Sequence, residues 1–380
     1  MSNSNVASEP SFGLPSDRAG KDIGIFLPMA NGGWILSSNA PPLDGSYAYN
    51  RRTAVLADEL GMDFVMSMAK WRGYGGPRDH WGTALDAQML IAGLAEATKR
   101  VKVWTTVHTL LQNPAVTAKM IATLDQISGG RAGLNVVTGA YKGEFDQMNA
   151  WRDGVDHDGR YDLAAEWIEA VKRLWREPSV TMDGRYIKLT DCRSEPKPVS
   201  NPRPFLVCAG VSPKGMQFSL EQMDAIFLTG RDNADLAATS RAAKARSRAF
   251  GRTIKTYTMM TIVLGESDAA AKAKADFYRA GLDEEALHGM LRAYGFLDAE
   301  MGAENAFVAS ARSSFMTPRL IGAPQTIADR AIELIDEAEL DGLMLIFPDY
   351  LEDMKVFAGQ VLPQIRARYV QNQGACGHAA

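Results

Sequence analysis

The sequence predicts an α/β fold, a (β/α)8 TIM barrel with insertions, and two observations carry this prediction. Eight short apolar runs alternate with amphipathic helical stretches along the chain. The runs are apolar on both faces, which is typical of parallel strands covered by helices. An open doubly wound sheet is the alternative. No G-x-G-x-x-G sequence follows a predicted strand, however, and the nearest glycine cluster, at 73–78, lacks the third glycine.

The predicted strands are short and are separated by longer helical segments. The strands cover residues 23–28, 62–68, 101–108, 131–138, 205–210, 225–230, 256–265 and 341–347. The helical patterns cover residues 50–61, 85–100, 114–130, 159–175, 233–250, 267–281 and 324–340. Several of these helices end at a glycine, which is common at helix C-termini. Eight strand–helix units favour closure into a barrel.

Two segments interrupt this alternation. Residues 178–204 contain an Asp-Gly turn and then a proline-rich loop, so we expect a small β-hairpin there. Residues 283–318 are longer than a plain connection, and such insertions are often lids. Because the alternation resumes after each, we predict one domain at 22–372 with two insertions, a disordered arm at 1–21 and a flexible tail at 373–380.

Composition and charge restrict the function. The chain has 380 residues, of which 46% are hydrophobic and 23% charged, as in ordinary globular proteins. A net charge of −4 without a basic run argues against a nucleic-acid partner. No signal peptide and no stretch of about 18 apolar residues is present, so neither secretion nor a membrane span is expected. Three cysteines without a C-x-x-C pair fit the cytoplasm.

Polar residues gather where a barrel normally carries its active site, at the carboxyl ends of the strands. Asn135 is the least expected of them, because asparagine is depleted in strands and a buried amide without partners costs about 1–3 kcal/mol. Strand alternation turns Leu134 and Val136 toward the helices and Asn135 toward the barrel axis. Asn135 is then either a core amide satisfied by backbone or an amide aimed at a ligand.

Other residues leave several chemistries open and exclude some. The five histidines show no metal-ligand spacing, so no metal is expected, and neither G-x-S-x-G nor a P-loop is present. His108 could be an acid or base, or a structural histidine. Lys70 could form a Schiff base, hold a phosphate or simply be solvated. Arg160 and Tyr161 stand beside a helix start, which suits a phosphate. The residues alone indicate a barrel enzyme with a polar, anion-tolerant mouth.

Several motifs together resemble the bacterial luciferase-like (group C) FMN-dependent monooxygenases, and within them the enzymes that open the uracil ring. The motifs are SMAKWRGYGG (67–76), TLDQISGGRAGLNVVTGAYKGEFDQM (123–148), GRYDLAAEWIEAVKRLW (159–175), TDCRSEPKPVS (190–200), VCAGVSPKGM (207–216) and IGAPQTIADR (321–330). The similarity extends from about residue 23 to about residue 357.

This resemblance implies a two-component enzyme in a TIM barrel. Reduced FMN would come from a separate reductase that uses NADH, and O2 would be the co-substrate, activated as a flavin-N5-peroxide that attacks a carbonyl. The family also implies a homo-oligomer. By the same resemblance, the residues that contact FMN would be Ala69, Lys70, Asn135, Glu144, Arg160, Tyr161 and Ser212, with Tyr161 and Ser212 near the phosphate. Catalytic residues around the oxygen site would be Met66, Thr106 and Asn135.

Two positions depart from the uracil-opening enzymes. Ala140 stands where they resemble one another in having tryptophan, and the loss of an indole would leave room for a substrate larger than uracil or change what stacks on it. Met66 replaces a leucine, a nearly volume-conserving change. We place Ala140 and His108 in the substrate pocket.

Three functions follow from these expectations. The leading one is oxygenation and opening of a nitrogen heterocycle such as uracil or a related amide-containing ring. The first alternative is the same scaffold acting on a sulfonate or sulfone, or on a larger ring compound such as a flavin. The second is a non-catalytic flavin-binding barrel, against which Thr106 and Asn135 argue, because a mere flavin binder needs no oxygen site.

Overall fold

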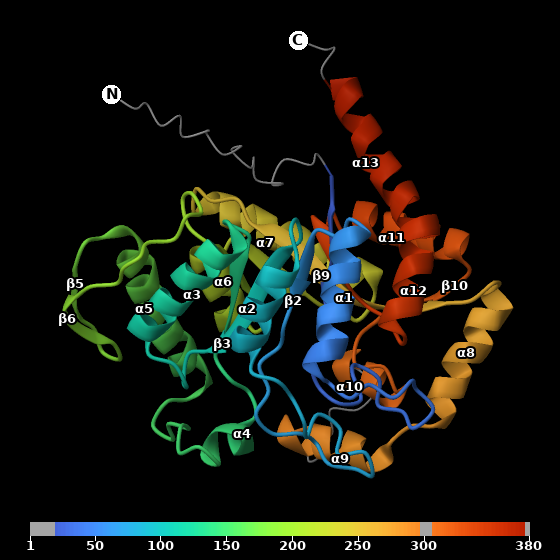
Figure 1. The fold of residues 1–380 in the computed structure, drawn as a ribbon, viewed down its shortest axis with the longest axis horizontal. Coiled ribbons are helices and arrows are strands. Elements are labelled where there is room, and N and C mark those ends of the chain that lie inside the picture. The colour runs from blue at the N-terminus through green and yellow to red at the C-terminus, as the bar shows by residue number, and fades with distance from the viewer. Residues whose placement is uncertain (1–19, 297–305, 377–380) are drawn as a thin grey trace, which may run out of the picture.

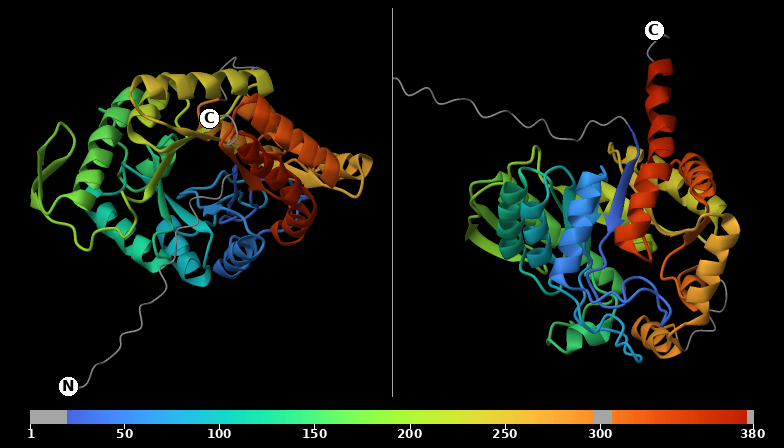
Figure 2. Two further views of the ribbon diagram at one scale, coloured as in Figure 1. Left: turned by 90° about the horizontal axis from the view of Figure 1, so that it is seen from above. Right: turned by 45° about the vertical axis from the view of Figure 1, so that its right-hand side comes forward.

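A closed barrel of eight parallel strands forms the centre of the computed structural model, which describes residues 20–296 and 306–376. The ring is closed because β9 pairs with both β8 and β11, and Figure 2 shows it from above. The TIM barrel predicted from the sequence is confirmed, and each predicted strand overlaps an observed one. The barrel strands are β1 (Asp22–Phe26), β2 (Phe64–Met66), β3 (Lys102–His108), β4 (Ala132–Val137), β7 (Phe205–Cys208), β8 (Ala225–Leu228), β9 (Lys255–Leu264) and β11 (Gly342–Ile346).

Helices surround the barrel (Figure 2) and bury their apolar faces on it. The predicted helices are observed as α1 (Tyr47–Glu59), α2 (Ala87–Ala97), α3 (Pro114–Ser128), α5 (His157–Arg176), α7 (Asn233–Ala249), α8 (Asp268–Ala280) and α11 (Pro324–Glu337). Helix α6 (Pro213–Gln222) is not among the stretches that the sequence predicted. It begins with Ser212 as N-cap and proline in its first turn, and both residues favour the start of a helix. It was missed because it is short and its apolar stripe is weak.

The two interruptions of the alternation have different structures. Strands β5 (Val180–Asp183) and β6 (Lys188–Cys192) form the expected antiparallel hairpin, at the left edge of Figure 1. The second segment contains α9 (Glu284–Ala293) and α10 (Ala306–Arg312), while its residues 297–305 lie outside the described part. Together with α4 (Lys142–Asp146), these helices lie at one end of the barrel, at the bottom of Figure 1. This is the end at which the strands finish.

Strand β10 (Arg319–Gly322) was not predicted from the sequence. It pairs with the second half of β9 and lies outside the closed ring.

The C-terminal part of the described chain is helical. Helix α12 (Tyr350–Val356), the π-helical turn η2 (Phe357–Val361) and α13 (Leu362–Cys376) follow β11, so a helix continues into the predicted tail. Residues 1–19 of the predicted arm and residues 377–380 lie outside the described chain, and the domain limits stay a prediction. Within the described ranges, no helix is long and apolar enough to cross a membrane.

An aromatic layer fills the barrel directly below its carboxyl end. The rings of Phe64 on β2 and Trp104 on β3 stack at 4.0 Å, and Tyr257 on β9 lies about 6 Å from both. Gly133 on β4 makes room for this layer, because a Cβ there would lie 2.3 Å from the indole of Trp104. Two residues further along the same strands come Met66, Thr106 and Asn135, so the aromatic layer is the floor under these side chains.

The floor makes a testable contribution to stability. We expect Trp104→Ala to lower the free energy of unfolding by about 3–5 kcal/mol, because it removes a fully buried indole and leaves a cavity. Denaturant unfolding measures this, with Met89→Ala as the control, since Met89 is 70% exposed on α2. A loss at Trp104 no larger than that of the control would show that the layer does not support the barrel.

Candidate functional site

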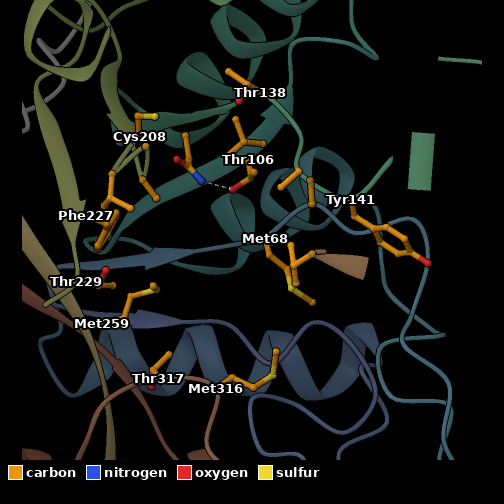
Figure 3. A pocket seen from close by; sticks show the side chains of 18 of the residues that line it. Met68, Thr106, Thr138, Tyr141, Cys208, Phe227, Thr229, Met259, Met316 and Thr317 are labelled. Carbon is orange, nitrogen blue, oxygen red and sulfur yellow. Dashed lines mark hydrogen bonds between the residues drawn. The ribbon is translucent and has the colours of Figure 1, made fainter. Parts of the chain in front are cut away.

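A cavity of about 680 Å³ opens at the carboxyl ends of the strands, a volume typical of sites for drug-sized ligands (Figure 3). The structure brings nearly all of the predicted site residues to this one cavity. The lining includes Met66, Ala69, Lys70, Thr106, His108, Asn135, Ala140, Glu144, Arg160 and Tyr161. Ser212 does not line the cavity itself, but its side chain hydrogen-bonds to the lining residue Tyr161.

Asn135 belongs to a hydrogen-bond chain that joins three neighbouring strands. Its Nδ2 donates to Thr106 Oγ1 at 2.9 Å, the dashed line in Figure 3, and the Thr106 hydroxyl donates to the backbone carbonyl of Ser67. The hydroxyl of Thr106 has one proton, which it donates to Ser67. Towards Asn135 it can therefore only accept a hydrogen bond, and this fixes the orientation of the Asn135 amide. The Oδ1 atom of Asn135 is buried and has no protein partner. The amide therefore keeps a buried acceptor for another group.

Lys70 and Glu144 form a buried ion pair on the wall of the cavity. Lys70 Nζ lies 3.6 Å from Glu144 Oε1, and each side chain is only 4% exposed. The ammonium also faces the rings of Tyr74, Tyr141 and Trp81, at 4.5, 4.9 and 5.8 Å from their centroids. Burial lowers the pKa of Lys70 to about 8, against the opposing attraction of Glu144. A solvated lysine, one of the alternatives for Lys70, is therefore wrong.

His108 is held as a neutral ring beside this pair. Its Nε2 lies 3.3 Å from the carbonyl oxygen of Ala69, so we assign the ring proton to Nε2, and its ring meets Phe145 edge to face. Burial lowers the pKa of His108, and the nearby Lys70 lowers it further, while Glu144 and the bond to Ala69 act in the opposite direction. The imidazole is thus uncharged near neutral pH, and its Nδ1 has no protein partner.

Another part of the cavity has the features of an anion site. Ser212 is the N-cap of α6, and the hydroxyl of Tyr161 hydrogen-bonds to Ser212 and Thr138. Tyr161 packs so closely on the first turn of α6 that a Cβ on Gly215 would lie 2.6 Å from its hydroxyl oxygen. Arg160 stacks on Trp151 at 4.7 Å, and its buried Nε has no protein partner. A helix N-terminus beside a guanidinium and hydroxyl groups suits a phosphate.

A second set of residues that line the cavity was not predicted from the sequence. Trp81, with a left-handed φ of 62°, reaches the cavity from a tight loop, and Met68, Met259 and Met316 also line it. The position of Met259 follows from strand alternation after Tyr257, so this signal was available. Met316 comes from the second insertion, for which no periodic pattern could be used. Among residues 20–296 and 306–376, no group of three or more His, Cys, Asp or Glu side chains could hold a metal ion.

Comparison with known proteins identifies the class to which this fold and site belong. The family model of the luciferase-like monooxygenases matches residues 22–340, and the chain belongs to this family. It is a monooxygenase of the luciferase-like type, so the resemblance and the oxygenase class expected from the sequence are confirmed.

Two relatives and two solved structures show how similar the chain is to known proteins. The chain is 35% identical over 355 residues to the pyrimidine monooxygenase RutA of Variovorax paradoxus (strain S110), covering 91% of this chain and 95% of the relative. It is 36% identical over 355 residues to RutA of Serratia proteamaculans (strain 568), covering 91% and 96%. Two solved structures share the fold, each covering 92% of both chains: a riboflavin lyase (TM-score 0.80, 22% identity) and a long-chain alkane monooxygenase (TM-score 0.79, 21% identity).

The ion pair gives a prediction for the site. We expect Glu144→Gln to shift the pKa of Lys70 further below 8, because the carboxylate is what opposes the effect of burial. A pH titration of ¹⁵N-labelled lysine side chains by NMR measures this shift, with the exposed Lys142 as an internal reference. An unchanged or raised pKa of Lys70 in the variant would mean that Glu144 does not stabilise its charge.

Proposed function

We propose that the chain is the oxygenase component of a two-component system, which takes reduced FMN from a separate NADH-dependent reductase and O2 as co-substrate. Its reaction oxygenates and opens an amide-containing nitrogen heterocycle; in support, the RutA relatives are named pyrimidine monooxygenases. The observation that carries the proposal is the fixed Asn135–Thr106 pair, which leaves the buried Oδ1 of Asn135 without a protein partner. A buried acceptor of this kind costs free energy unless a ligand supplies a donor.

The residues of the cavity fit FMN at both of its ends. Arg160, Tyr161 and the N-terminus of α6 behind Ser212 would hold the phosphate. Lys70 and Glu144 would hold the pyrimidine edge of the flavin ring, since an ammonium can donate to a carbonyl and a carboxylate can accept from an N–H. Ala69 lies beside them in the wall. When bound, FMN supplies the oxygen chemistry.

The protein's own part in the reaction is orientation and exclusion of water. Met66, 2% exposed, and the aromatic floor below it keep the oxygen site dry, while Thr106 and Asn135 present fixed polar groups in it. Lys70, with a pKa of about 8, carries a positive charge at neutral pH and would donate a hydrogen bond to a carbonyl group of the bound ring. His108 and Ala140 form the substrate side of the wall.

The proposal predicts a strict requirement for the complete system. Product should form only when FMN, a flavin reductase and NADH are all present, because the chain carries no nicotinamide-binding signature. Asn135→Ala should reduce product at least about 100-fold without loss of fold, since it removes a fixed group from the reacting centre. Mass spectrometry of a pyrimidine reaction measures the product, and Asn233→Ala, an exposed amide on α7, is the control. Oxidation of NADH by the protein alone, or full activity of Asn135→Ala, would contradict the proposal.

The phosphate end can be tested separately. We expect Arg160→Ala to weaken FMN binding about tenfold or more, because a charge-assisted hydrogen bond is lost, and to leave riboflavin binding unchanged. Quenching of flavin fluorescence measures both dissociation constants. An equal effect on FMN and riboflavin would place the Arg160 contact away from the phosphate.

A further inference from the structure

We propose that the substrate is an uncharged ring compound with an apolar side bulkier than a single pyrimidine ring. This inference rests on the proposed function and names the substrate class of the same cavity. Three features carry it: the methionine-rich wall opposite Thr106, the pairing of the charged groups in the lining, and the small side chain at Ala140.

The wall opposite Thr106 is apolar and adaptable. Met259 and Met316 lie across the cavity from Thr106 in Figure 3, with Thr229 beside Met259, and Phe227 lies at the side near Cys208. The nearby Thr317 hydroxyl already bonds to Thr261 at 2.7 Å, so it adds little polarity. Methionine side chains are flexible and polarisable, and they fit flat apolar ligands of varied outline. This wall therefore favours an apolar ring face over a polar chain.

Charged side chains of the described lining either pair with one another or, like Arg160, lie at the phosphate end of the cavity. Lys70 pairs with Glu144 at 3.6 Å, and Arg231 pairs with Asp235 at 3.4 Å. Arg160 lies at the phosphate end beside Tyr161, where FMN would use it. A carboxylate or sulfonate on the substrate would thus be buried against the methionine wall without a counter-ion, which is costly. This argues against the sulfonate alternative that the sequence left open.

Ala140 gives the cavity room on its other side. It follows Gly139, whose φ is 83°, and its methyl group is exposed to the cavity next to Tyr141. A large residue at this position would close the wall, whereas alanine leaves space for a second ring or a bulky substituent. Charge and size thus point to the same class of uncharged, extended ring compounds.

Three probes with the same dioxopyrimidine ring separate the effect of substrate size from the effect of substrate charge. They are uracil, quinazoline-2,4-dione, which adds an apolar ring, and quinazoline-2,4-dione-7-carboxylate, which adds a charge to that ring. With oxidised FMN bound, we expect quinazoline-2,4-dione to bind at least tenfold more tightly than uracil and at least tenfold more tightly than its carboxylate. Calorimetric titration of the flavin-loaded protein measures all three.

A matched pair of variants tests the cause of the discrimination. Met259→Lys places a cation in the wall and should reverse the preference toward the carboxylate, whereas Met89→Lys, at an exposed position on α2, should leave it unchanged. Equal or tighter binding of the carboxylate by the unmodified protein, or binding of none of the three probes, overturns the inference. FMN binding, measured first, separates this result from failure of the proposed function, since that function fails if FMN does not bind.

Discussion

The hydrogen-bond chain from Asn135 through Thr106 to the backbone of Ser67 is the interaction on which the site depends. It crosses β4, β3 and the end of β2, and it forms because Thr106 and Asn135 are direct neighbours in the parallel register of the barrel. A shift of one residue would turn either side chain toward the helices and break the chain. The aromatic layer below prevents such a shift, since Trp104 is seated over Gly133 in the same register.

The ion pair of Lys70 and Glu144 is a second constraint, because it connects the cavity wall to the second insertion. Glu144 accepts the backbone N–H of Trp71, and Tyr74, which faces Lys70, hydrogen-bonds to the hydroxyl of Tyr294 at 2.8 Å. Tyr294 follows α9 directly and lines the cavity. A buried ammonium is tolerated here because a carboxylate and three aromatic faces replace its lost hydration. The insertion thus helps to hold the charge that the site uses.

The sequence predicted the parts of this structure that arise from local periodicity. The eight barrel strands and the inward orientation of Asn135 follow from alternation along each strand, and the observed lining confirms that orientation. The burial of Lys70 could not be predicted, because it depends on aromatic residues from a loop and on Glu144, 74 positions further along the chain. Met316 was missed for the same reason, since an insertion carries no repeat from which its position could be derived. Strand β10 was missed because it pairs with β9 outside the closed ring and so has no place in the eight-unit repeat from which the strands were predicted.

The central claim is that Thr106 and Asn135 act as one unit in the reaction with oxygen. A double-mutant cycle with Thr106→Val and Asn135→Ala tests it most directly, with product formation per reduced FMN as the readout in single-turnover experiments. The structure predicts that the double variant loses about as much as either single variant, because either change breaks the same hydrogen-bond chain. Losses that add in free energy would show that the two residues act independently and would contradict the account.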